Sequence, residues 1–328
     1  MQRKQQKVRS KKRLFRKTPQ FRARSSITKL RTALSSLASS GEITTDQTVE
    51  TCMRHAFCIA LSLLSVILFS RSGNAADCGD SSEGFTEWLN DFRSKAAVEG
   101  ISTKTLSVAF DNVVYDRAII SRDRDQHVFH LSFERFSKRI ITPSRLSRGR
   151  DLLHRNSTLL RKIEEQYGVP GPVLVAIWGL ETGFGADNGH FRTTQALATL
   201  AYDCRRTSTF KDELKNALII IEQGDVPASQ MRGDWAGEIG QTQFMPSSYL
   251  KYAVDFDSDG RRDLIRSTAD VLASTANYLK GKGWQPGAGW AEGEPNFPVF
   301  LEWNKANVYA KTIAYFATKL SEDPTTDK

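Results

Sequence analysis

The stretch that most restricts how this chain can fold runs from residue 168 to 185 and reads GVPGPVLVAIWGLETGFG. Pro170 and Pro172 suit the first turn of a helix, because the N–H that proline lacks would have no intrahelical partner there. The residues from 173 to 180 are apolar apart from one glycine. This pattern predicts a helix that is enclosed by protein on all sides rather than half-exposed to water.

A glutamate stands where this helix should end. Gly183 favours a left-handed helix end, which places Glu181 in the last turn. The negative end of the helix dipole and the apolar neighbours Ile177 and Trp178 both disfavour the ionised carboxylate, so we expect its pKa to be raised. A glutamic acid that is protonated near neutral pH is suited to act as a general acid. The alternative is an ordinary surface glutamate after a buried helix, and this stretch alone fits both.

The net charge of +9 is concentrated at the N-terminus. Residues 1–52 hold 13 of the 46 Lys and Arg but 3 of the 37 Asp and Glu, so the rest of the chain holds 33 basic and 34 acidic residues. We interpret residues 1–52 as a basic, low-complexity extension that buries no core, or as residues that are not translated. Because the remainder is nearly neutral, the charge gives no support for a nucleic-acid partner.

Residues 53–75 have the pattern of a secretory signal peptide. A short basic start is followed by an apolar run of 14 residues, 56–69, and by small residues at Gly73 and Ala75. This pattern predicts translation from Met53 and cleavage after Ala75, and the run is too short to span a membrane comfortably. We therefore expect an exported chain that is not membrane-anchored. The alternative is a cytoplasmic arm, residues 1–52, in front of a signal anchor.

Two cysteines remain after such cleavage. Cys52 and Cys58 would be removed, leaving Cys78 and Cys204. In an oxidising compartment two remaining cysteines pair more often than they stay free, so we expect a disulfide between them.

Helical spacing of apolar residues recurs along the rest of the chain. The predicted helices cover residues 80–100, 106–114, 128–141, 144–167, 193–202, 210–223, 267–279 and 300–320. Only 299–301 resembles a short edge strand, and 281–298 is rich in Gly, Pro and Trp, typical of a loop that lines a cleft. We expect a mainly α fold in one compact body, residues 76–320, followed by a disordered tail, residues 321–328.

A glycine-rich segment, residues 231–248, is a candidate wall for a sugar. Its glycines allow close approach of the backbone, Trp235 offers an aromatic face, and Gln241 and Gln243 offer amides. Glycans present hydroxyl groups to such amides and apolar ring faces to such aromatics. The alternative is a connection whose glutamines cap neighbouring helices.

The sequence DFDSDG, residues 255–260, matches the front of an EF-hand loop, where oxygens converge on Ca²⁺. Position 12 of the loop is Arg266 instead of the usual bidentate glutamate, so a longer loop is required. The expected ligands are Asp255, Asp257, Asp259, the carbonyl of Arg261, and Asp270. We expect a structural Ca²⁺ and no cofactor for catalysis; a metal-free turn is the alternative.

Four motifs occur in series: IWGLETGFG, RGDWAGEIGQTQFMPSSY, VDFDSDGRRDL and ANYLKGKGW. In this order and spacing they resemble the lytic murein transglycosylases of the membrane-bound-B type, similar to glycoside hydrolase family 103. The resemblance extends from about residue 85 to 320. It implies a lysozyme-like catalytic core of the goose-type or soluble lytic transglycosylase kind, with an added α domain and an EF-hand-like loop.

The resemblance also implies a function. Such enzymes are periplasmic lyases that bind peptidoglycan strands and cut the β-1,4 bond between N-acetylmuramic acid (MurNAc) and N-acetylglucosamine (GlcNAc) without water, leaving 1,6-anhydro-MurNAc ends. We expect a monomer. The implied catalytic residue is Glu181, and the implied glycan-binding residues are Gln243, Tyr278, Asn304 and Tyr309. Ordinary glycosidases use two carboxyl groups, whereas here Glu181 would act first as acid and then as base.

One residue departs from the family pattern. Asp234 stands where the family often has a serine that helps to orient the substrate. Its carboxylate could bind the sugar as well, and as a nearby like charge it should raise the pKa of Glu181 further. Two alternatives follow. One is a lysozyme-type hydrolase on the same fold, in which Asp234 or Glu238 activates water, and the other is a non-catalytic peptidoglycan-binding module.

Overall fold

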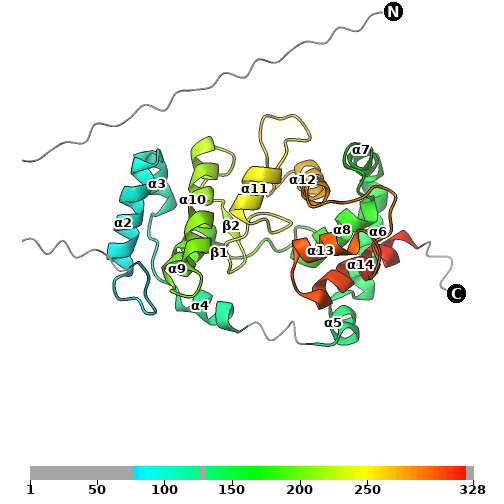
Figure 1. Ribbon diagram of the computed structural model, residues 1–328. Helices are drawn as coiled ribbons and strands as arrows, with labels where there is room; N and C mark the ends of the chain where they lie inside the picture. The colour runs from blue at the N-terminus through cyan, green and yellow to red at the C-terminus, as the bar shows by residue number, and fades with distance from the viewer. Residues whose placement is uncertain (1–76, 126–130, 323–328) are drawn as a thin grey trace, which may run out of the picture. The chain divides into compact units, whose positions relative to one another are not determined.

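The computed structural model describes residues 77–125 and 131–322. The basic extension, the predicted signal peptide and residues 323–328 lie outside the described residues. Within them the chain is almost entirely helical (Figure 1). The elements are α2 (Phe85–Val98), α3 (Thr103–Ala109), α4 (Arg117–Arg124), α5 (Phe133–Ile140), α6 (Pro143–Arg155), α7 (Ser157–Tyr167), α8 (Gly171–Thr182), β1 (Phe191–Arg192), α9 (Thr193–Tyr202), α10 (Thr207–Gln223), β2 (Arg232–Gly233), α11 (Pro246–Tyr252), α12 (Thr268–Gly281), α13 (Phe297–Trp303) and α14 (Asn307–Ser321).

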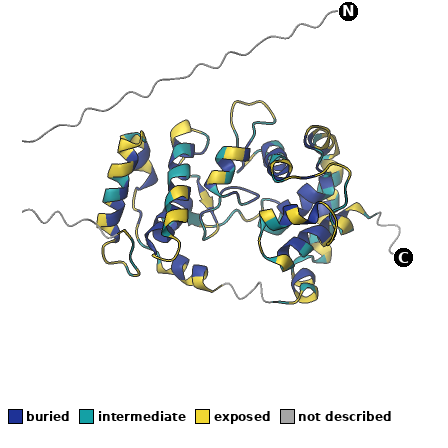
Figure 2. Cartoon of the chain, in the orientation of Figure 1, coloured by how far each residue is buried: buried dark blue, intermediate teal, exposed yellow. Residues whose placement is uncertain are grey.

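Helix α8 is the buried helix that the sequence predicts. It begins after Pro170 and ends at Gly183, whose φ of 59° is left-handed. Residues 173–179 are all buried, because α14, α6, α7 and α12 pack around this helix. Figure 2 shows the general pattern, with buried residues on the inner faces of the helices and exposed ones on their outer faces.

A second group of helices packs around α10, which contacts α9, α11 and α3. Helices α2 and α4 contact α9 in turn. Cys78 and Cys204 are joined by a disulfide, and the N–H of Gly79 donates to the carbonyl of Tyr202 at 2.8 Å. These contacts attach the start of the described chain to the turn between α9 and α10.

A minimal sheet connects the two loops that form the site. Strands β1 and β2 pair antiparallel with Phe191 opposite Gly233, which joins the segment after α8 to the glycine-rich segment. The backbones approach so closely that a Cβ on Gly189 would lie 2.1 Å from the carbonyl oxygen of Gly233. A Cβ on Gly233 would lie 1.8 Å from the carbonyl oxygen of Glu238. Only glycine fits these two positions.

Two predicted helices are interrupted. The stretch 144–167 forms α6 and α7, which meet at Asn156, where the side-chain Nδ2 donates to the carbonyl of Leu152 at 2.9 Å. The stretch 300–320 forms α13 and α14, separated at Asn304, whose backbone is extended and whose Oδ1 accepts from the N–H of Ala306. Asparagine side chains compete with the helical backbone for hydrogen bonds and can end a helix. They do not alter the spacing of the apolar residues, so the sequence pattern does not show these breaks.

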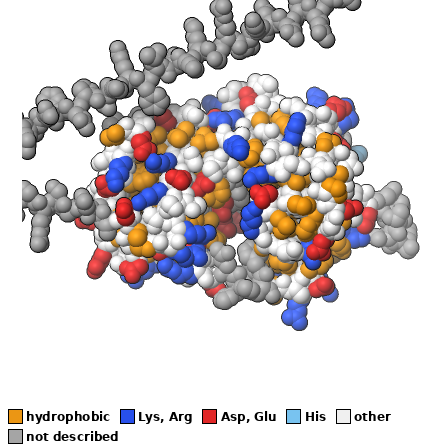
Figure 3. Space-filling view, in the orientation of Figure 1, with side chains coloured by type: hydrophobic (Ala, Val, Ile, Leu, Met, Phe, Trp, Pro, Cys, Tyr) orange, Lys and Arg blue, Asp and Glu red, His pale blue; other side chains and the backbone are white. Residues whose placement is uncertain are grey.

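Other differences concern short elements. The predicted strand at 299–301 is wrong, because these residues lie in α13. Helices α4 and α11 and both two-residue strands were not predicted; α4 is rich in charged residues and α11 spans only seven residues. Within the described residues, no helix combines the length and the apolar character needed to cross a bilayer. Acidic and basic side chains are interspersed on the face drawn in Figure 3.

Candidate active site

Three helices hold the carboxyl group of Glu181. The residue lies in the last turn of α8, as predicted. Its Oε1 accepts a hydrogen bond from Nε1 of Trp303 at 2.7 Å and another from the hydroxyl of Tyr309 at 2.8 Å. Trp303 ends α13 and Tyr309 lies in the first turn of α14. The orientation of this carboxyl group is therefore fixed by residues more than 120 positions later in the chain.

The surroundings of Glu181 raise the pKa of its carboxyl group into the neutral range. Burial raises the pKa of Glu181 to about 7, the hydrogen bonds from Trp303 and Tyr309 oppose this shift, and the charge of Asp234 adds to it. The direction agrees with the sequence-based expectation, with burial as the largest cause. Because both hydrogen bonds reach Oε1, the acid proton belongs on Oε2, which is left free to face a ligand.

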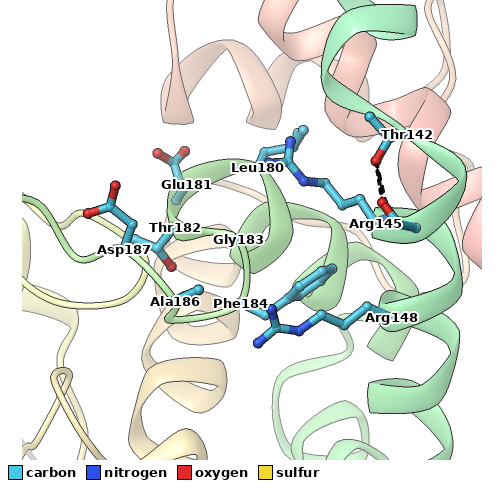
Figure 4. Close-up of a pocket in the computed structure, with 11 residues that line it drawn as sticks. Thr142, Arg145, Arg148, Leu180, Glu181, Thr182, Gly183, Phe184, Ala186 and Asp187 are labelled. Carbon is cyan, nitrogen blue, oxygen red and sulfur yellow. Dashed lines mark hydrogen bonds between the residues drawn. The ribbon is translucent and has the colours of Figure 1, made fainter.

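Glu181 lies at the junction of two cavities. The first has a volume of about 540 Å³, and its walls include Thr142, Arg145 and Arg148 of the α5–α6 region and Asp187 after α8. Figure 4 shows the two arginines reaching in from α6 and the two carboxyl groups, of Glu181 and Asp187, on the opposite side. The guanidinium of Arg148 lies over the ring of Phe184, 5.4 Å from its centroid.

The second cavity has a volume of about 280 Å³ and extends from Glu181 toward the glycine-rich segment. Its walls comprise Glu181, Glu238, Gln243, Phe244, Met245, Ser248, Tyr278, Glu302, Trp303 and Asn304. Because Glu181 lines both cavities, a polymer that occupies both would pass next to this residue.

Gln243 lies in this cavity wall, where its side chain joins three loops. Its Nε2 donates to the carbonyls of Asn188 at 3.2 Å and Gly240 at 2.6 Å, and its Oε1 accepts from the N–H of Asp234 at 3.0 Å. Both amide hydrogens are thereby used within the protein, and the backbone of Gln243 is in the left-handed region, with a φ of 52°. Any contact of this amide with a ligand is left to the remaining lone pair of Oε1.

The other predicted glycan-binding residues also lie at the site, with different tasks. Tyr278 lines the second cavity while its hydroxyl donates to the carbonyl of Glu302 at 2.7 Å. Asn304 lines it too, with Oδ1 occupied by the N–H of Ala306. Tyr309 uses its hydroxyl on Glu181. The structure thus brings these residues together, but several of their polar groups form hydrogen bonds with other residues of the protein.

Two carboxyl groups accompany Glu181. Asp234 is exposed, and its charge raises the pKa of both Glu181 and Glu238. Burial, followed by the charges of Asp234 and Glu181, raises the pKa of Glu238 to about 8. Glu238 therefore carries a proton at neutral pH for most of the time.

Sequence reasoning missed Trp303, Arg145 and Arg148. Trp303 is adjacent to the predicted Asn304, and an aromatic N–H donor next to a predicted site residue was the available signal. The arginines carry no motif, and their position in a cavity follows only from the packing of α6 against α8.

The acidic loop between α11 and α12 brings three predicted metal ligands together. Carboxylate oxygens of Asp255, Asp257 and Asp259 lie within 4.8 Å of one another, and all three residues are exposed. Backbone N–H groups order the loop: Asp255 accepts from Asp259 at 3.1 Å and from Gly260 at 2.9 Å. A cluster of carboxylate oxygens is the donor set that Ca²⁺ prefers, so these residues fit the ion.

The two other predicted metal ligands, Asp270 and Arg261, lie outside this cluster of carboxylates. Asp270 is fully buried at the start of α12, and its carboxylate accepts from the N–H of Phe256 at 2.7 Å and of Asp263 at 2.8 Å. It closes the loop through these backbone bonds and is not part of the exposed cluster. Arg261 is exposed, and its N–H donates to Asp259 at 2.9 Å.

A half-buried glutamic acid that lines two cavities of an α-helical body is a candidate site for acid–base chemistry on an extended substrate. The chain matches the family described as "Transglycosylase SLT domain" over residues 84–293. This match covers more than half of the chain, which therefore belongs to that family.

Individual relatives agree with this assignment. Membrane-bound lytic murein transglycosylase B of Escherichia coli (strain K12) is 37% identical over 170 residues, which cover 49% of this chain and 47% of that protein. The match thus spans about half the length of this curated relative.

Solved structures extend the similarity over more of the fold. SltB3 from Pseudomonas aeruginosa, in complex with NAG-NAM-pentapeptide, is 31% identical, with a TM-score of 0.70, over 75% of this chain and 81% of that one. The Escherichia coli lytic transglycosylase Slt35 in complex with calcium is 24% identical, with a TM-score of 0.66, over 76% of this chain and 97% of that one. These matches confirm the predicted lysozyme-like, mainly α fold of the soluble lytic transglycosylases.

Proposed function

We propose that this chain is a peptidoglycan lytic transglycosylase that cuts the β-1,4 bond between MurNAc and GlcNAc without water. The observation that carries this proposal is the half-buried Glu181, which lines both cavities and whose pKa is raised to about 7. Sugars on both sides of the scissile bond have a place there. The family membership and the lytic transglycosylases named above support the substrate class.

In the first step Glu181 acts as a general acid. Its Oε2 proton passes to the glycosidic oxygen, the bond from that oxygen to C1 of MurNAc breaks, and GlcNAc leaves with the proton. Glu181 is then a carboxylate whose Oε1 is stabilised by the N–H of Trp303 and the hydroxyl of Tyr309. Both donors stay protonated through this step, and burial and the proximity of Glu181 raise the pKa of Tyr309 well above its ordinary value.

In the second step the same carboxylate acts as a base. The 6-hydroxyl oxygen of MurNAc attacks C1, and its proton passes to Glu181, which restores the acid. The product is a 1,6-anhydro ring, and no water is consumed. SltB3 in complex with NAG-anhNAM-pentapeptide, which is 32% identical to this chain over 80% of that one, supports this outcome.

The hydrolase alternative requires a second group to activate water. Glu238 is poorly suited, because a pKa of about 8 leaves it protonated at neutral pH. Asp234 is the remaining candidate, and the mass of the products distinguishes the two reactions, since an anhydro end lacks one water. A purely binding module would not need a raised pKa at Glu181.

We further infer a structural Ca²⁺ held by Asp255, Asp257 and Asp259, with Arg261 contributing its carbonyl. The exposed cluster supports this, and the ion would neutralise the repulsion between the three carboxylates. Asp270 would act by shaping the loop.

We also propose that residues 53–75 direct export to the periplasm, that residues 1–52 are absent from the mature protein, and that residues 76–320 work there as a monomer without a membrane anchor. The apolar run 56–69 and the disulfide between Cys78 and Cys204 support an oxidising compartment.

The test of the proposed function is digestion of purified peptidoglycan, followed by mass spectrometry of the released fragments. We expect anhydro-MurNAc ends from the wild-type protein and none from Glu181→Gln. Reducing MurNAc ends from the wild-type protein would show that water is the acceptor and would overturn the lyase assignment.

A further inference from the structure

The mechanism above leaves one carboxyl group of the site without a task. Glu238 lies in the glycine-rich segment, and its backbone is held from two sides. Its carbonyl accepts from Oγ1 of Thr193 at 3.2 Å. The next residue, Ile239, exchanges backbone hydrogen bonds with Phe244 at 2.8 and 3.0 Å. The side chain therefore projects from a fixed point.

That side chain reaches the same cavity as Glu181. Glu238 lines the cavity of about 280 Å³ together with Gln243 and Trp303. Its Oε2 is buried and has no hydrogen-bond partner among the described residues. Only two other side-chain atoms of the described residues are buried without a partner. A buried polar atom without a partner is costly, so its retention at a ligand-facing wall calls for an explanation.

The surroundings make this group a hydrogen-bond donor. Burial and the negative charges of Asp234 and Glu181 keep the carboxyl group protonated at neutral pH. The nearby amide oxygen of Gln243 already accepts from Asp234, and Oε1 of Glu181 already accepts two hydrogen bonds. Because no described residue hydrogen-bonds to Oε2 of Glu238, a ligand in the cavity can supply its acceptor.

The other walls indicate which acceptor fits. Phe244, Met245 and Trp303 give this cavity an apolar side, next to the donor of Glu238. The N-acetyl group of an amino sugar combines a methyl group with a carbonyl oxygen, which is a good neutral acceptor. A sugar hydroxyl offers no methyl group for the apolar side.

We propose that Glu238 donates a hydrogen bond from its carboxyl group to the N-acetyl carbonyl of an amino sugar bound in this cavity. This inference rests on the proposed function, because it assumes a glycan substrate. It assigns Glu238 to substrate recognition and removes it from the candidates for a water-activating base.

The test measures binding without turnover. In the Glu181→Gln background, we would titrate a GlcNAc tetramer and its fully de-N-acetylated counterpart by calorimetry. Adding Glu238→Ala should weaken binding of the GlcNAc tetramer about tenfold, the effect of one hydrogen bond. Adding Glu238→Gln should change it less than about threefold, because the amide still donates. The de-N-acetylated tetramer should bind equally to all three proteins.

Controls separate recognition from folding. Glu87→Ala, on the exposed face of α2, serves as the matched loss of a glutamate far from the cavity in sequence, and melting temperatures report on the fold of each variant. Equal affinity of all variants for the GlcNAc tetramer would overturn the inference, as would equal weakening by Ala and Gln. Failure of the Glu181→Gln protein to bind the tetramer would overturn it too. The proposed function is judged separately, by anhydro ends from wild-type peptidoglycan digests.

Discussion

Two clusters of carboxyl groups in this molecule have opposite surroundings. Glu181 and Glu238 border cavities, and burial raises the pKa of each into the neutral range. Asp255, Asp257 and Asp259 lie in an exposed loop whose backbone N–H groups point at their oxygens. Packing shields the first pair from solvent, whereas the second group stays exposed.

The difference shows how solvation assigns the task of a carboxyl group. A carboxyl group that packing shields from solvent holds a proton that it can transfer or share. An exposed group keeps its hydration, and several carboxylates together attract a cation. Local structure therefore decides between proton chemistry and metal binding for the same functional group. Four predictions test this contrast.

The largest effect is expected from Glu181→Gln. The amide preserves the shape of the side chain but has no proton to transfer, so release of anhydro-MurNAc ends should fall by about 10³-fold or more. The rate is measured by chromatography of peptidoglycan digests. The exposed Asp212→Asn on α10 is the control and should leave the rate unchanged. Near-wild-type release by Glu181→Gln would contradict the role of Glu181.

The loop should respond to metal removal instead. A chelator should lower the melting temperature of the wild-type protein by several degrees, because an ion bound only by the folded state stabilises it by about 2–3 kcal/mol at 100-fold excess over Kd. Asp257→Asn should melt at the same temperature with and without chelator. A wild-type melting curve that ignores both chelator and added Ca²⁺ would leave the loop as a turn without metal.

Glu238→Gln should stabilise the protein only at high pH. The pKa of Glu238 is raised from 4.5 to about 8 in the folded protein. Its carboxyl group therefore costs no stability below pH 4.5, where it is protonated in both the folded and the unfolded protein, and destabilises the folded protein increasingly as the pH rises toward 8. Glutamine does not titrate. The variant should therefore gain about 1–2 kcal/mol over the wild type at pH 8 and nothing at pH 4, with allowance for screening by solvent. Denaturant unfolding at both pH values measures this, and a gain of the same size at pH 4 would point to packing instead.

The smallest effects form a pair of opposite sign in the pH–rate profile. The charge of Asp234 raises the pKa of Glu181, so Asp234→Asn should lower it and move the alkaline limb to lower pH. The N–H of Trp303 lowers the pKa of Glu181, so Trp303→Phe should move that limb to higher pH. Each variant should move the alkaline limb by about half a pH unit to one pH unit. Shifts in the same direction would contradict this account.

The sequence predicts the local parts of this architecture well. The apolar run and Gly183 act within a few residues of Glu181, so helix α8, its end and the position of the carboxyl group could be predicted. The spacing of Asp255, Asp257 and Asp259 is equally local. Breaks caused by single asparagine side chains could not be predicted, since they leave the apolar pattern intact.

The partners of Glu181 could not be predicted from any periodicity. Trp303 and Tyr309 are 122 and 128 positions away, and only the packing of α13 and α14 brings them to the carboxyl group. The unpartnered oxygen of Glu238 is likewise a property of the folded cavity. The resemblance to a family names some of the participants, whereas their hydrogen bonds belong to this fold.

The family match ends at residue 293, before both residues that hold the carboxyl group of Glu181. A fragment cut at that boundary would retain the four motifs quoted from the sequence but lose α13 and α14, and with α14 the main cover of α8. Its glutamate would face water with neither donor in place. A truncated or fused version of this chain that keeps the site intact must therefore include helix α14, which ends at Ser321.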